Sequence, residues 1–216
     1  MSAMNPYRTL RQFASDEFII NKSRFIGYAA PCETEAEALA FLQSIRTKHK
    51  DATHNCYAYI IGQNAGIMRY SDDGEPAKTA GTPALEVLQH SGLTDLIVVI
   101  TRYFGGVLLG AGGLTRAYTK GAKDVLDAVG IAAMSLWTLW DVPCTYPLLE
   151  RMKLEVAAAG GVIRDAEYGA DITLRTAFPA GTAETFQLRL TELSAGSLTM
   201  TAAGEEFLPG PREEAN

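Results

Sequence analysis

The sequence predicts an α+β protein built from two units. A continuous apolar run from Leu96 to Ile100 is typical of a buried strand, and it lies in a first part that mixes strands with helices. The last part shows the order strand, helix, strand, strand, helix, strand. The charge distribution changes near residue 135, between the two parts. Residues 1–135 carry 13 basic and 13 acidic side chains, and residues 136–216 carry 6 basic and 12 acidic ones, so the second part accounts for the whole net charge of −6.

Composition narrows the class of protein. The 216 residues are 47% hydrophobic, enough for a sizeable core, and no run approaches the roughly 18 apolar residues of a membrane span. The N-terminus lacks the apolar segment of a signal peptide, so we expect a cytoplasmic protein without membrane contact. Cys32, Cys56 and Cys144 are scattered, which predicts free thiols. The acidic second part is unsuited to a phosphate backbone, so a nucleic acid would meet the first.

The first elements follow from alternation and capping residues. Phe13–Ala30 alternates loosely and predicts two or three short antiparallel strands. Thr34 is placed to cap an amphipathic helix over residues 35–48. Basic residues close this helix, where they complement its negative end or, as the alternative, contact nucleic acid.

The next elements are a strand over residues 54–61, a partner strand over 67–70, and a helix that begins at Thr82-Pro83 and runs to His90. His54 and Cys56 share one face of the first of these strands. This pairing suggests a nucleophile, but two positions along a strand place the side chains outside hydrogen-bond reach, and core packing is the better interpretation.

An acidic turn, Ser71–Pro76, precedes that helix. Asp72, Asp73 and Glu75 have three interpretations: ligands of a divalent cation, turn and backbone capping, or a polar recognition surface. The spacing does not match a calcium loop, and we expect no metal or other cofactor.

A glycine-dense segment follows the central strand, which ends in Thr101, Arg102 and Tyr103. The glycines are Gly105, Gly106, Gly110, Gly112 and Gly113, and a helix is expected from Leu114. Strand, glycine loop and helix N-terminus form an anion-binding geometry, but the spacing fits no standard phosphate fingerprint, so a packing or partner-docking loop remains the alternative. We expect Arg102 and Arg116 to converge on one anion-attracting surface beside the acidic turn. Alternatively, Arg116 pairs with Asp72 or Asp73.

The helix from Leu114 to Val129 is amphipathic. Its predicted buried stripe comprises Leu114, Tyr118, Gly121, Val125 and Val129. The opposite side carries Arg116, Lys120 and Lys123 together with Asp124 and Asp127. This basic row is either a solvated face or a nucleic-acid track.

The second unit is predicted to have a ferredoxin-like βαββαβ fold without a catalytic constellation. Its expected elements are strand 136–142, helix 147–159, strand 162–168, strand 171–178, helix 183–193 and strand 197–202. The expected domains are residues 1–134 and 135–208, and residues 209–216 form a flexible tail.

Three segments, HNCYAY, SDDGEPAKTAGTPALEVL and VVITRYFGGVLLGAGGLTRAY, resemble the YigZ/IMPACT family in order and separation. The resemblance covers nearly all of residues 5–130. It implies an N-terminal α/β sandwich of the ribosomal-protein type shared with domain IV of elongation factor G, and a C-terminal domain similar to domain V of that factor. No catalytic chemistry is securely assigned to the family. Its eukaryotic members regulate translation by binding a ribosome-associated activator of a stress kinase. We do not transfer the identity of that partner, because we expect this chain to differ from the eukaryotic members in the extra RWD domain.

The resemblance and the basic row together predict a non-enzymatic, translation-linked regulatory or binding protein. Its N-terminal domain would dock RNA, the ribosome or a translation-associated protein, without DNA sequence specificity. The alternative is a phosphate- or nucleotide-handling enzyme that uses the glycine loop and the acidic turn. The predicted anion or partner site is Arg102, Tyr103, Phe104, Gly105, Gly106, Gly110, Gly112, Gly113, Arg116 and Tyr118. The accessory surface is His54, Cys56, Asp72, Asp73, Glu75, Thr79, Lys120 and Lys123.

Overall fold

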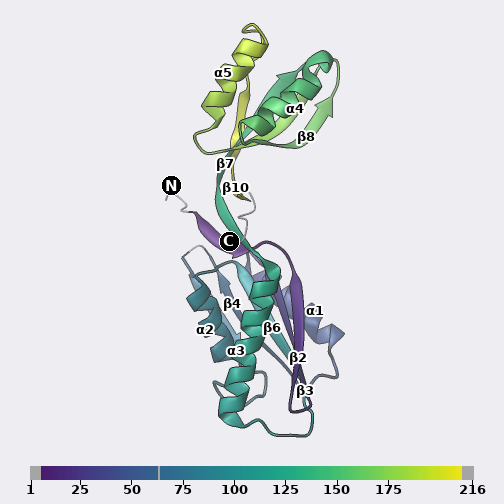
Figure 1. Cartoon of the computed structure of the whole chain (residues 1–216), viewed down its shortest axis with the longest axis vertical. Coiled ribbons are helices and arrows are strands. Elements are labelled where there is room, and N and C mark those ends of the chain that lie inside the picture. The colour runs from purple at the N-terminus through teal and green to yellow at the C-terminus, as the bar shows by residue number, and fades with distance from the viewer. Residues whose placement is uncertain (1–5, 63, 211–216) are drawn as a thin grey trace. The chain divides into compact units, whose positions relative to one another are not determined.

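The computed structural model describes residues 6–62 and 64–210, and it divides into two compact units, Tyr7–Ala133 and Met134–Gly210 (Figure 1). The expected tail lies outside the described residues from 211 onward. Across the part of the chain that the structure describes, no helix combines the length and the apolar character needed to cross a membrane. All three cysteines are free thiols, as predicted.

The N-terminal unit is built on an antiparallel five-stranded sheet with the order β2-β3-β6-β4-β5. The strands are β2 (Ala14–Ile20), β3 (Ser23–Pro31), β4 (His54–Ile61), β5 (Ile67–Ser71) and β6 (Leu96–Tyr103). The predicted strands are therefore confirmed. The apolar run at Leu96 lies at the centre of the sheet, where both of its faces are covered, which explains its lack of alternation.

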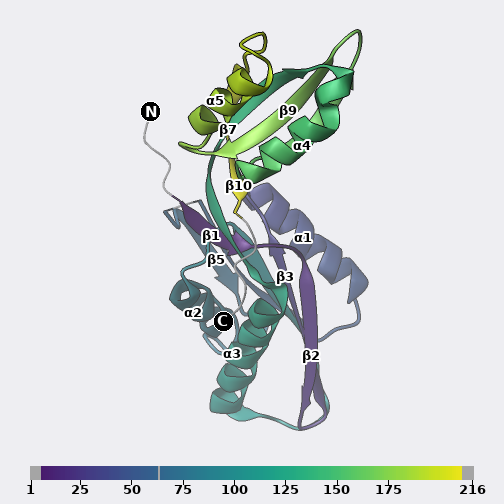
Figure 2. The same ribbon diagram turned by 45° about the horizontal axis from the view of Figure 1, so that its top comes forward.

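Helices cover both faces of this sheet (Figure 2). α2 (Gly81–Ser91) and α3 (Gly110–Val129) pack on one face, and α1 (Glu35–Lys48) packs on the other. The alternation of β4 assigns its side chains as predicted: Cys56 lies in the core under α2 and α3, and Tyr59 lies in the core under α1. Thr34 caps α1, because its Oγ1 accepts the Glu37 N–H at 3.2 Å.

Two helix starts in the N-terminal unit differ from the prediction. α3 begins at Gly110 rather than Leu114, so the last three glycines of the segment belong to its first turn and not to a loop. α2 begins at Gly81 rather than Thr82, whose buried hydroxyl has no hydrogen-bond partner among the described residues. The cap of α2 comes from a different segment, the acidic turn. The short strand β1 (Tyr7–Leu10) was not expected, and it is held by the Thr94 N–H, which donates to the Arg8 carbonyl at 2.9 Å.

The C-terminal unit has the predicted βαββαβ order, and its four strands lie in the order β10-β7-β9-β8 of the ferredoxin-like fold, within a five-stranded sheet in which β1 also pairs with β7. Its elements are β7 (Ile131–Cys144), a short 3₁₀ turn (Tyr146–Leu148), α4 (Leu149–Ala158), β8 (Val162–Tyr168), β9 (Ile172–Pro179), α5 (Ala183–Leu193) and β10 (Thr201–Pro209). The last strand begins four residues later than predicted, because Ser194–Ser197 close the end of α5.

Candidate functional site

The acidic turn joins β5 to α2, and each of its carboxylates has a separate role. The Asp72 carboxylate accepts three backbone N–H groups, from Lys78 at 2.8 Å, Ala80 at 3.0 Å and Gly81 at 2.8 Å. Asp72 therefore supplies the negative charge that the N-terminus of α2 lacks in its own first turn. Gly81 must be glycine, since a Cβ there would lie 2.7 Å from the carbonyl of Ser71.

Asp73 ties the turn to α1 and β4. Its Oδ2 accepts the Asn55 N–H at 2.7 Å, and its Oδ1 forms an ion pair with Arg46 Nη2 at 2.9 Å. The carbonyl of Asp73 accepts from Nδ1 of His54 at 2.8 Å. Asp73 is thus occupied by three neighbours, and none of them is Arg116.

Glu75 lies in the protein interior, 8% exposed, at the centre of a polar cluster. Its Oε1 accepts from Nη1 of Arg102 at 2.6 Å and from the hydroxyl of Tyr118 at 2.8 Å, and it lies 3.8 Å from Nε2 of His54. A buried carboxylate is tolerated when it is paired and hydrogen-bonded in this way. Glu75 therefore joins the turn to β6, α3 and β4.

Arg102 is 4% exposed and is fully enclosed by this unit. Its Nη2 donates to Ser23 Oγ at 3.3 Å, and its guanidinium lies 5.4 Å from the ring centres of both Phe25 and Phe104. Nε of Arg102 has no hydrogen-bond partner among the described residues. The expected convergence of Arg102 and Arg116 on one exposed surface is wrong, because Arg102 turns inward to Glu75 and Arg116 is exposed.

The Cys56 thiol is fully buried and donates to the Asp72 carbonyl at 3.0 Å, with the Tyr118 hydroxyl 3.4 Å away. Burial raises the pKa of Cys56 well above its usual value, and it does the same for the Tyr118 hydroxyl. Both groups therefore stay protonated. Since a cysteine nucleophile needs a thiolate, the arrangement favours the packing interpretation of Cys56 and His54.

Tyr103 belongs to a second chain of hydrogen bonds. The Tyr28 hydroxyl lies 2.6 Å from Nε2 of His49, and the Tyr103 hydroxyl lies 2.8 Å from Nδ1 of the same ring. Tyr103 in turn donates to Asp51 at 3.3 Å. Burial lowers the pKa of His49, and the positive charges of Lys48 and Arg24 lower it further. A neutral ring that accepts at Nε2 and donates at Nδ1 satisfies all three partners.

The segment between β6 and α3 is pinned at Gly105 and exposed on both sides of it. A Cβ on Gly105 would lie 2.0 Å from the carbonyl carbon of Lys22, so this glycine lets the segment lie against the β2–β3 turn. On either side of this glycine the segment is exposed: Phe104, just before it, is 45% exposed, and Val107 and Leu108, after it, are 42% and 85% exposed. We call these three residues together with Arg116 the loop surface.

The basic row of α3 is exposed, as predicted, and it is separate from the Glu75 cluster. Lys120 pairs with Asp124 at 2.5 Å, and its ammonium lies 5.1 Å from the ring centre of Phe18. Arg116 and Lys123 make no ion pair with any described residue, so the expected alternative pairing of Arg116 with Asp72 or Asp73 is wrong. Gly106, Gly110 and Gly112 are exposed, Gly113 is partly so, and Thr79 is buried with its hydroxyl on the Pro76 carbonyl.

The contacts of the acidic turn show how far its carboxylates are available as metal ligands or as an acid and base. Each of its three carboxylates is already engaged by backbone N–H groups or by basic and hydroxyl side chains of the same unit. Within the described ranges, no group of three or more His, Cys, Asp or Glu residues has a geometry that could hold a metal ion. The arrangement therefore supports turn and capping roles and gives no support to a metal-dependent enzyme at this turn.

The residues of these clusters that sequence reasoning missed include Ser23, Phe25 and Arg46. Ser23 lies 79 positions from its partner Arg102 and also accepts the Gly105 N–H at 3.2 Å. Arg46 lies among the basic residues at the end of the helix predicted over residues 35–48, and nothing local to α1 indicates its partner Asp73, 27 positions away. Contacts of such long range leave no periodic signal in a sequence.

Comparison with known proteins agrees with this two-unit architecture. Residues 21–126 match the family model "Impact N-terminal domain", and residues 142–197 match "Domain of unknown function (DUF1949)". IMPACT family member YvyE of Bacillus subtilis is 38% identical over 193 residues, which cover 89% of each chain. IMPACT family member YigZ of Escherichia coli is 37% identical, covering 86% of this chain and 92% of that protein.

A solved structure and eukaryotic proteins also match. A crystal structure described as that of a hypothetical protein aligns with a TM-score of 0.61 at 35% identity, covering 92% of this chain and 98% of that one. Eukaryotic proteins named IMPACT, including those of Dictyostelium discoideum and Saccharomyces cerevisiae, match over shorter stretches. With both domains matched and bacterial relatives similar along most of its length, the chain belongs to the IMPACT family.

Proposed function

We propose that this chain is a translation-linked regulatory protein that docks the ribosome, through its RNA or an associated protein, by the loop surface of its N-terminal unit. The observation that carries the proposal is the exposure of Phe104, Val107 and Leu108 within one short segment. Large apolar side chains gathered on the surface of a soluble protein mark an interaction site when they are contiguous.

The chemistry beside this segment supports an anionic partner. Arg116 is exposed and unpaired among the described residues, and the first turn of α3 carries no acidic residue and no side-chain cap. Free N–H groups at the positive end of a helix of this length attract phosphate oxygens. An exposed aromatic ring such as that of Phe104 suits stacking on an unpaired base.

The family relationship supports the link to translation. The resemblance implies a translational role for eukaryotic members, and eukaryotic proteins named IMPACT match this chain over part of their length. A shared fold alone is weak evidence for a shared function, so the proposal rests on the loop surface.

Sedimentation through a ribosome gradient tests the proposal. We expect the full chain to migrate with ribosomes or their subunits at low salt. It should be released as salt increases, because salt cations compete with the basic side chains for the RNA phosphates. Leu108→Ser and Arg116→Ala should each weaken this association while leaving the melting temperature nearly unchanged, since both residues are exposed.

Leu154→Ser is the matched control, because Leu154 is 71% exposed but lies on α4 in the other unit. It should leave sedimentation with ribosomes unaffected. The proposal fails if the chain stays at the top of the gradient at every salt concentration, or if Leu154→Ser weakens association as much as Leu108→Ser does.

A further inference from the structure

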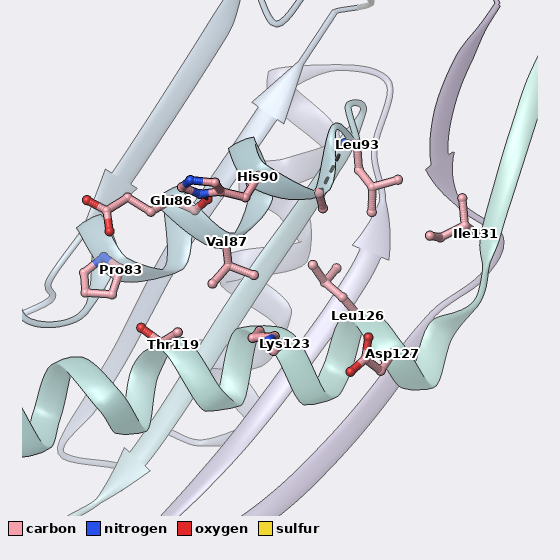
Figure 3. Close-up of a pocket in the computed structure, with 11 residues that line it drawn as sticks. Pro83, Glu86, Val87, His90, Leu93, Thr119, Lys123, Leu126, Asp127 and Ile131 are labelled. Atoms are coloured by element: carbon pink, nitrogen blue, oxygen red, sulfur yellow. Dashed lines mark hydrogen bonds between the residues drawn. The ribbon is translucent and has the colours of Figure 1, made fainter.

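A groove of about 510 Å³ lies between α2 and α3, on the side of the N-terminal unit remote from α1 (Figure 3). Its apolar lining is Pro83, Val87, Leu93, Leu126 and Ile131, and its polar lining is Glu86, His90, Ser91, Thr119, Lys123 and Asp127. The groove shares none of its residues with the Glu75 cluster or with the loop surface. It has no role in the function proposed above.

The groove is elongated along the two helices. On α2 it is lined from Pro83 to Ser91, and on α3 from Thr119 to Asp127. Nine residues of a helix, separated by eight steps of 1.5 Å, span about 12 Å, or slightly more than two turns. A groove of this length between two helices fits the side chains that a third helix presents at positions i, i+3 or i+4, and i+7.

The charged side chains around the groove include three that are not neutralised by an ion pair within the described residues. Glu86, Lys123 and Asp127 form no ion pair with any described residue, whereas Lys120, one turn from Lys123, pairs with Asp124. Two carboxylates and one ammonium leave an acidic excess. That excess would repel the phosphates of RNA and attract a basic partner.

We propose that this groove binds an amphipathic helix of a partner protein, apolar on the face that enters the groove and basic on its flanks. The apolar side chains would pack on Val87 and Ile131, the apolar lining residues with the more accessible surface. Lysine or arginine side chains of the partner would reach Glu86 and Asp127 at the two sides.

Selection from a phage-displayed library of random helical peptides on the full chain tests the proposal, followed by methyl NMR of the most enriched peptide. We expect enriched sequences with apolar residues at helical spacing and basic residues beside them. The peptide should shift the methyl signals of Val87 and Ile131. The double variant Glu86→Lys with Asp127→Lys should bind it at least about tenfold more weakly, since two attractions become repulsions.

The matched control is Glu184→Lys with Asp171→Lys, two exposed residues of the C-terminal unit that give the same change in net charge. This control should bind the peptide as the unmodified chain does. The proposal is overturned if no enriched peptide depends on Glu86 and Asp127, or if an RNA oligonucleotide shifts the same methyl signals. A dimer of this chain that the groove variant dissociates would also overturn it, in favour of a second copy as the occupant. Because the readout is peptide binding, failure here is distinct from failure of ribosome association.

Discussion

The guanidinium of Arg102 and the carboxylate of Glu75 form an ion pair with 2.6 Å between Nη1 and Oε1, although both side chains are almost fully removed from solvent. The two residues come from the end of the central strand and from the acidic turn. Their pairing holds the acidic turn in place, and Asp72 of this turn caps α2. One buried contact therefore connects the sheet to the start of a helix.

Removing one partner of this pair should be strongly destabilising. Glu75→Gln or Arg102→Met leaves the other charge buried without compensation, and we expect each to lower the free energy of unfolding by about 3–5 kcal/mol. Urea denaturation measures the effect. The double variant Arg102→Met with Glu75→Gln should cost less than the sum of the two single changes.

Arg24→Met provides the comparison, because Arg24 pairs with Glu17 at 2.6 Å where both side chains are about half exposed. Its loss should cost less than about 1 kcal/mol. Equal costs for the exposed and the buried pair would contradict the structural role assigned to Glu75.

Asp72 should behave as a helix cap although it lies outside the helix sequence. Asp72→Ala removes the acceptor of three backbone N–H groups at the start of α2, and we expect a loss of about 2 kcal/mol. Thr82→Val is the control, since the Thr82 hydroxyl is buried without a partner in the described structure and its removal should be neutral or stabilising. Thermal unfolding of both variants measures the difference. A large loss from Thr82→Val would restore Thr82 as the cap.

The contrast between Asp72 and Thr82 shows where sequence reasoning holds. Alternation along β4 predicts which of its side chains face α1 and which face α2 and α3, because a strand places successive side chains on opposite faces. The start of α2 was misplaced because its cap is a carboxylate eight or nine positions upstream, and local spacing rules favour Thr82. Structure that follows a periodic pattern can be predicted from the sequence, whereas a helix cap that another segment supplies cannot.

The candidate site shows the same division. The sequence singled out Glu75, Arg102, Tyr118 and Cys56, and the structure brings all four together, but as an interior cluster rather than an exposed anion site. A sequence pattern indicates which polar and reactive residues belong to a site. It does not indicate that the Arg102 side chain turns inward, because that depends on Ser23 and Glu75 from distant segments.

The glycines of the segment after β6 should differ sharply in their tolerance of alanine. Gly105→Ala places a methyl group against the Lys22 carbonyl, and we expect a loss of about 1–3 kcal/mol from this overpacking. Gly112→Ala, inside α3, where a Cβ would make only an ordinary contact with Nη1 of Arg116 at 3.6 Å, should instead stabilise the chain by about 0.5–1 kcal/mol. Denaturant midpoints of the two variants test this. Stabilisation by both would show that the segment does not lie against the β2–β3 turn.

His49 should make the stability of the N-terminal unit fall on acidification. Its pKa in the folded chain lies below the ordinary value of 6.5, so the folded state binds fewer protons than the unfolded state near and below that pH. Its contribution to stability is complete above about pH 6.5 and is lost progressively as the pH falls. The free energy of unfolding measured from pH 7.5 to about pH 5 should therefore decline, and His49→Gln should flatten this decline. A decline that persists in full in His49→Gln would show that other groups cause it.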